Sequence, residues 1–69
     1  MGVESLVIGE RYVHDDYPNR VVQYAYNYDG EPMGLLYEPT TDGGWHAKRW
    51  IGIDNWDAER MTPYSGDQG

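Results

Sequence analysis

The chain has 69 residues, with twelve acidic and five basic side chains, a formal net charge of −7 at pH 7, and neither cysteine nor phenylalanine. This composition excludes disulfides and thiolate metal sites, and it disfavours direct binding to nucleic acids or anionic membranes, which are themselves negative. No apolar run reaches the roughly 18 residues that a membrane span needs, and the first ten residues lack the basic region and cleavage site of a signal peptide. We therefore expect one cytoplasmic domain, residues 1–69, with no membrane contact.

Three tryptophans and seven tyrosines supply most of the large apolar surface. A domain of this size buries only about 60% of the surface that its extended chain exposes, and each of these rings carries a polar group that needs a partner or water. We expect a shallow core in which several rings are half exposed. The ordered part is predicted at about 6–64, with Met1–Ser5 loosely docked and the tail 65–69 flexible.

The first strand is predicted at Glu10–His14, where polar and apolar residues alternate. A turn rich in Asp, Pro and Asn follows at 15–19. The most clearly patterned stretch, Arg20–Glu38, is a predicted β-hairpin with its turn at Asp29–Pro32, because Asp-Gly between two alternating runs favours a tight turn.

One face of the hairpin carries an aromatic stripe. Val22, Tyr24 and Tyr26 are predicted to face inward, and Tyr28 to be exposed near the tip. After a second loop at 39–44, a strand is predicted at Trp45–Ile51, where strict alternation would place Trp45 and Trp50 on opposite faces.

A short helical turn is predicted after Asp54, which has the chemistry of an N-cap, with Asp57 three residues on in place of the usual Glu or Gln. Asp57 and Arg60 have the spacing of a surface ion pair. A last short strand is predicted at 61–64. Together these elements predict an all-β domain, a small and strongly bent antiparallel sheet of four to five strands with one short helical turn before the last strand.

Two segments resemble small prokaryotic and phage SH3-like barrel domains of unknown function. Gly9–His14 is similar to their opening strand, and Asp54–Tyr64 to their closing segment, in which a polar turn carries one aromatic side chain into the core and a proline follows. The resemblance covers roughly residues 8–64. It implies an SH3-like barrel, a core position for Trp56 and a prokaryotic or phage origin, and it implies no activity.

The sequence offers no constellation for catalysis. The only serines, Ser5 and Ser65, lie near the termini, and no glycine-rich phosphate loop precedes a helix, so we expect a protein that is not an enzyme and has no cofactor. His14, Asp15 and Asp16, with His46, come nearest to a metal cluster. Neighbouring residues of a strand point to opposite faces, so we expect a solvated turn there and no metal.

The aromatic excess favours a non-catalytic protein-interaction module, because tyrosine and tryptophan are common at binding hot spots. The predicted binding surface combines three aromatic residues with nearby acids: Tyr28, Tyr37, Trp45, Asp29, Glu31 and Asp42. The competing interpretation is that at least half of the rings only fill the core. The alternative function is an acidic nucleic-acid mimic that inhibits a DNA- or RNA-binding protein, and self-association is a further possibility.

Overall fold

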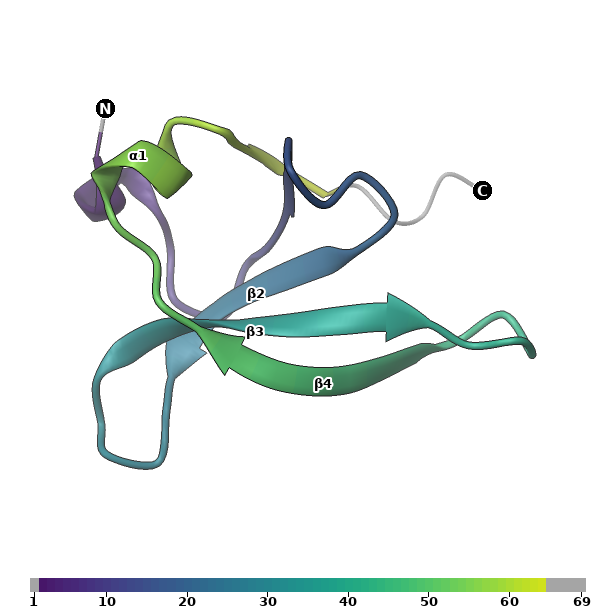
Figure 1. The fold of residues 1–69 in the computed structure, drawn as a ribbon. Helices are drawn as coiled ribbons and strands as arrows, with labels where there is room; N and C mark the ends of the chain where they lie inside the picture. The colour runs from purple at the N-terminus through teal and green to yellow at the C-terminus, as the bar shows by residue number, and fades with distance from the viewer. Residues whose placement is uncertain (1, 65–69) are drawn as a thin grey trace.

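The computed structural model describes residues 2–64, which form one antiparallel sheet of five strands (Figure 1). The sheet has the spatial order β4-β3-β2-β1-β5, so that each of the first three strands pairs with the next, and β5 returns to pair with β1. The elements, with the 3-10 turn η1, are η1 Val3–Ser5, β1 Arg11–His14, β2 Val21–Tyr26, β3 Pro32–Pro39, β4 Trp45–Ile51, α1 Asn55–Ala58 and β5 Met61–Pro63. The predicted all-β class is confirmed, with an open sheet that ends at β4 and β5.

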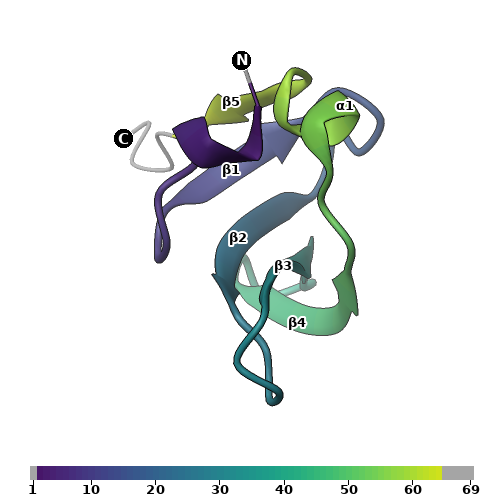
Figure 2. The ribbon, with the colours of Figure 1, turned by 90° about the vertical axis from the view of Figure 1, so that its left-hand side faces the viewer.

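The sheet bends along β2, which curves from β1 and β5 down to β3 and β4 (Figure 2). The core lies on the inner face of this bend, and the side chains buried there include the in-register pairs Tyr12–Val22 and Val22–Leu36. Val22 is fully buried, and Ala58 brings α1 into the same interior. Among the residues that the structure describes, no helix is long and apolar enough to cross a membrane.

Gly34 makes one close approach in the core possible. A Cβ atom at this position would lie 2.7 Å from Val22 Cγ1 and 2.9 Å from Ile53 Cδ1, closer than side-chain carbons normally approach. The bare backbone of β3 therefore lets the segment before α1 pack directly onto the sheet.

The β2–β3 hairpin is confirmed, but its turn begins at Asn27, two residues earlier than predicted. The Asn27 side-chain oxygen accepts hydrogen bonds from the backbone N–H groups of Asp29 (2.8 Å) and Glu31 (3.0 Å). Gly30 takes a φ of 81°, which glycine adopts without strain. Tyr26, predicted to face inward, is instead 59% exposed, because it is the last residue of β2 and lies beyond the core.

A β-bulge changes the faces of β4. Tyr37 lies opposite Ala47 and Leu36 opposite Arg49, so the pairing skips Lys48. The extra residue shifts the alternation, and Trp50, opposite Leu35, therefore shares a face with Trp45, opposite Pro39. The prediction that the two tryptophans lie on opposite faces was wrong for this reason.

The N-terminal segment is docked, which differs from the predicted start of order at residue 6. The Val3 backbone N–H donates to Asn55 Oδ1 (2.9 Å), which ties η1 to the start of α1. Gly2 is buried in this contact, and a Cβ there would lie 2.5 Å from the same Asn55 oxygen. The tail predicted at 65–69 lies outside the described residues.

Candidate functional site

Among residues 2–64 the most buried polar side chain is that of His14, at the end of β1, with 1% of its surface exposed. The backbone N–H of Asp16 donates to its Nδ1 atom at 3.0 Å. Because Nδ1 accepts this hydrogen bond, the proton of the neutral ring lies on Nε2, which donates to Asp57 Oδ1 at 2.9 Å. Both ring nitrogens are thus paired within the protein.

Asp57 also completes the cap of α1. Its backbone N–H donates to Asp54 Oδ1 (3.0 Å), and its Oδ2 accepts from the Asp54 backbone N–H (3.3 Å), which confirms Asp54 as the N-cap. Burial acts to raise the pKa of the Asp57 carboxyl, but the hydrogen bonds from His14 and from the Asp54 backbone outweigh it. The pKa therefore lies below its usual value.

A histidine–carboxylate pair is a common catalytic arrangement, but this one is built into the fold. The nitrogen that would face a substrate, Nδ1, is already occupied by the backbone of Asp16, and the ring is inaccessible. His46 lies on the exposed strand β4, and within residues 2–64 no three His, Asp or Glu side chains gather as a metal site would require. The pair therefore joins β1 to α1.

Trp56 and Arg60 form a surface stack beside this pair. The Arg60 guanidinium lies 3.8 Å from the centroid of the Trp56 ring and donates to the Trp56 carbonyl at 2.8 Å. Trp56 is 51% exposed, so the expected core position is wrong, and Ala58 is the residue of α1 that is buried. Asp57 does not pair with Arg60 as its spacing predicted, because its carboxylate binds His14.

Part of the predicted binding surface gathers at the β2–β3 turn. Tyr28 is 96% exposed, and its ring stands edge-on to Trp50 of β4, with ring centroids 6.3 Å apart. Asp29 and Glu31 are exposed in the same turn. We call these four residues, Tyr28, Asp29, Glu31 and Trp50, the tip patch. Trp50 was absent from the predicted surface because the bulge that brings it to this face has no sequence signature.

The other predicted binding residues lie elsewhere. Tyr37 is half-buried, donates its hydroxyl to Gln23 Oε1 (3.0 Å) and lies under the Arg11 guanidinium, 5.7 Å from the ring centroid. Trp45 is 40% exposed at the far end of β4 and packs against Tyr64, with centroids 6.0 Å apart. The structure therefore does not bring Tyr37 and Trp45 together with the tip patch.

Asp42 belongs to the β3–β4 loop and has a structural role there. The Thr40 hydroxyl donates to its carboxylate, and the Gly44 backbone N–H donates to the same oxygen at 3.3 Å. These hydrogen bonds hold the pKa of the Asp42 carboxyl below its usual value. Its carboxylate thus helps to fix the loop.

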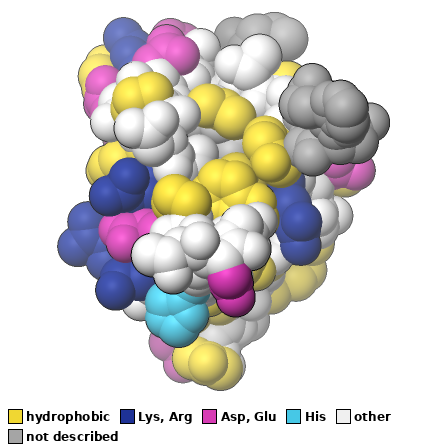
Figure 3. Space-filling view, turned by 90° about the vertical axis from the view of Figure 1, so that its right-hand side faces the viewer, with side chains coloured by type: hydrophobic (Ala, Val, Ile, Leu, Met, Phe, Trp, Pro, Cys, Tyr) yellow, Lys and Arg dark blue, Asp and Glu magenta, His cyan; other side chains and the backbone are white. Residues whose placement is uncertain are grey.

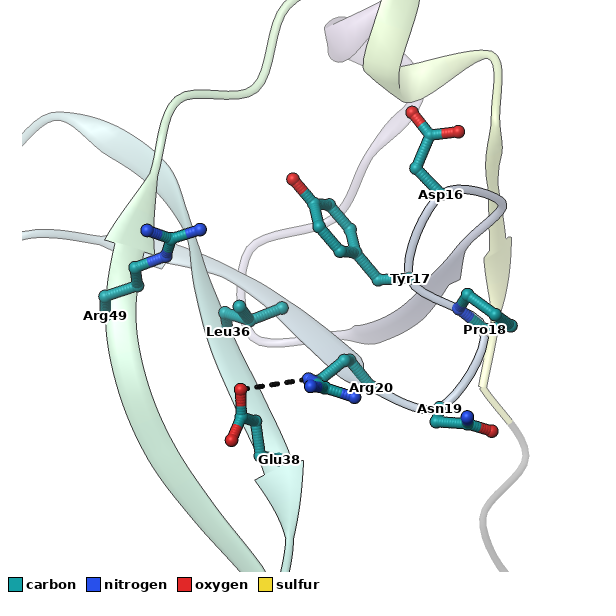
Figure 4. Close-up of a pocket in the computed structure, with 8 residues that line it drawn as sticks. All are labelled: Asp16, Tyr17, Pro18, Asn19, Arg20, Leu36, Glu38 and Arg49. Carbon is teal, nitrogen blue, oxygen red and sulfur yellow. Dashed lines mark hydrogen bonds and ion pairs between the residues drawn. The ribbon is translucent and has the colours of Figure 1, made fainter.

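A pocket that sequence reasoning missed opens between the β1–β2 loop and the strands β3 and β4 (Figure 4). Its volume is about 240 Å³. Residues 16–20 of the loop line one side, and Leu36, Glu38 and Arg49 line the other. Arg20 Nε donates to Glu38 Oε2 at 3.0 Å across its lower rim (Figure 4). The two arginines are 29 positions apart in the chain, so no local pattern pointed to this site.

The chain matches no protein-family model, no curated protein and no solved structure. The function is therefore inferred from the geometry of the tip patch and of the pocket.

Proposed function

We propose that this chain is a non-catalytic protein-interaction module, with an SH3-like barrel architecture, that binds a protein partner through the tip patch. The observation that carries the proposal is Tyr28, a large aromatic side chain that is 96% exposed at the end of a hairpin and lies edge-on to Trp50. An exposed tyrosine provides a large contact area at small conformational cost.

The turn that carries Tyr28 is already ordered. Two hydrogen bonds to the Asn27 side chain fix its backbone, so little conformational freedom is lost when a partner docks. Asp29 and Glu31 beside the rings favour a positively charged segment, and a lysine or arginine side chain could also lie over an aromatic face. The partner we infer is therefore a protein segment that carries basic residues.

The architecture has support from the topology. Three antiparallel strands in sequence, a fourth that continues the meander, and a fifth that returns to the first after a helical turn follow the order expected of an SH3-like barrel. The prokaryotic or phage origin and the cytoplasmic location remain predictions.

The test is affinity capture from a lysate of the source organism, or of its host, with washes at low and high salt. The bait is compared with Tyr28→Ser, which removes the ring from the tip patch, and with Tyr26→Ser, an exposed tyrosine outside it. We expect a protein that is retained at high salt by the unchanged chain and by Tyr26→Ser, and is lost from Tyr28→Ser. Equal capture by both variants would contradict the proposal.

The alternative, an acidic nucleic-acid mimic, has less support because several acids have internal partners. Glu38 binds Arg20, Asp42 fixes a loop, and Asp54 and Asp57 cap α1. Of the twelve acids, these four are not free to imitate a row of phosphates. A basic nucleic-acid-binding protein that is captured by all three baits and lost at high salt would favour the mimic.

A further inference from the structure

The pocket beside β4 has an apolar floor and polar walls. Leu36, only 4% exposed, forms the floor, and the ring of Tyr17 lies across from the Arg49 side chain (Figure 4). Tyr17 is held in place, since its ring packs on His14 at a centroid distance of 5.2 Å and its backbone carbonyl accepts from the Arg20 N–H at 3.0 Å. The wall opposite β4 is therefore fixed before any ligand arrives.

Two hydrogen-bond donors point into this space without a partner. Neither the Arg49 guanidinium nor the Tyr17 hydroxyl makes a hydrogen bond or ion pair with any residue that the structure describes. They approach each other from opposite sides above Leu36 (Figure 4). A guanidinium and a phenolic hydroxyl that converge in this way are suited to a planar anionic group, because both donate to oxygen.

The charges around the pocket leave Arg49 uncompensated. Glu38 is paired with Arg20, and the Asp16 carboxylate points away from the cavity (Figure 4). Strand β4 contains Lys48 and Arg49 and no acid, although the chain as a whole carries a charge of −7. The face drawn in Figure 3 shows Lys and Arg side chains gathered around an acidic one.

We propose that this pocket binds a carboxylate on a small apolar body, such as the C-terminal residue or an acidic side chain of a peptide, with Arg49 and Tyr17 donating to its oxygens. A volume of about 240 Å³ admits one side chain but is smaller than the roughly 300–1,000 Å³ of pockets that hold cofactors or drug-sized ligands. A singly charged carboxylate fits better than a phosphate dianion, because Glu38 lies on the same rim. No residue of the tip patch lines this pocket, so the proposal is independent of the proposed function.

The test is an NMR titration of the isotope-labelled chain with N-acetyl-L-leucine, which carries the carboxylate. N-acetyl-L-leucinamide is the uncharged control of the same shape, and phenyl phosphate is the competing phosphate ligand. We expect saturable shifts of the Tyr17, Leu36 and Arg49 signals with a Kd in the millimolar range for the carboxylate, and at least about tenfold weaker binding of the amide. Absence of saturable shifts, or equal binding of acid and amide, would overturn the proposal. Tighter binding of phenyl phosphate would overturn the preference for a carboxylate.

Variants test whether the ligand is held by the donors that line the pocket or only by the positive charge of β4. Arg49→Gln is expected to weaken binding about tenfold, and Tyr17→Phe about threefold, because each removes a donor from the site. Lys48→Gln removes the same charge from the adjacent residue, which does not line the pocket, and is expected to leave the affinity nearly unchanged. If Lys48→Gln weakens binding as much as Arg49→Gln, the anion is held by the net field of β4 and the proposal fails.

Discussion

His14 is almost completely removed from solvent, and its two ring nitrogens join three separate parts of the chain. Nδ1 accepts from the loop after β1, and Nε2 donates to Asp57 in α1, whose carboxylate also closes the helix cap. Neither ring nitrogen is therefore free to make a further hydrogen bond, and the loss of either partner leaves a buried polar atom without one.

Asp57→Ala is expected to lower the free energy of unfolding by about 2 kcal/mol, because it leaves His14 Nε2 a buried donor without an acceptor and removes half of the capping box. The measurement is urea denaturation followed by tryptophan fluorescence. The matched control is Glu59→Ala, whose exposed side chain lies two residues on and should change stability by no more than about 0.5 kcal/mol. Equal losses in both variants would show that the His14–Asp57 contact contributes nothing specific.

The lowered pKa of Asp57 predicts the direction of acid denaturation. Its pKa is below the value of about 3.9 that an unfolded chain has, so the unfolded state binds the proton first. The contribution of Asp57 is therefore complete above the unfolded pKa and is lost as the pH falls through the folded pKa. The free energy of unfolding, measured by denaturation between pH 2 and 7, should therefore fall less steeply with falling pH at the acid end in Asp57→Asn than in the unchanged chain.

Asp42→Asn is the control for this pH dependence. The Asp42 carboxyl also has a lowered pKa, but it lies at the surface, where water weakens each interaction, so its replacement should flatten the acid end less. A larger effect of Asp42→Asn than of Asp57→Asn would contradict the assignment to the His14 pair.

At the level of elements, the packing of the segment 52–54 on β3 depends on Gly34. Gly34→Ala is expected to cost about 1–3 kcal/mol of unfolding free energy, because the new methyl group would overlap Val22 and Ile53. Gly52→Ala is the control, since a Cβ there would meet no atom within 4 Å. Replacing Ile53 with Val in the Gly34→Ala chain should recover part of the loss, because it removes the Cδ1 atom; if it does not, the cost arises elsewhere.

The sequence predicted those elements whose signals are local. Strand β4 and the N-cap at Asp54 were found because alternation and cap chemistry require only neighbouring residues. The bulge at Lys48 could not be found, because it exists only in the pairing of β4 with β3. The Asp57–Arg60 pair was predicted from spacing, but a buried histidine that is distant in sequence competes more effectively for the carboxylate.

The candidate sites were predictable to a smaller extent for the same reason. The exposure of Tyr28 follows from its place in a turn and was expected, whereas its contact with Trp50 depends on the bulge. The pocket is assembled from a loop and two strands whose residues share no local pattern. Such convergence is visible only once the sheet is folded.

For the whole molecule, the net charge of −7 predicts that salt stabilises the fold. Self-repulsion destabilises a compact chain, and raising sodium chloride from 0.1 to 1 M shortens the screening length from about 10 to about 3 Å. The thermal midpoint should rise over this range. A variant with Asp15→Asn, Asp29→Asn and Glu31→Gln, which has a charge of −4, should show a smaller rise; an equal rise would assign the effect to the salt itself rather than to repulsion.

The bulge at Lys48 has a further consequence for how the protein behaves at high concentration. β4 is an outer strand seven residues long, and its unpaired backbone groups could extend the sheet into a neighbouring copy. A kinked edge that also carries a lysine resists such growth. Deletion of Lys48 would keep every pairing of β4 with β3 and would remove the bulge from this edge strand. The shortened chain should therefore fold and then form oligomers or fibrils that the full chain avoids.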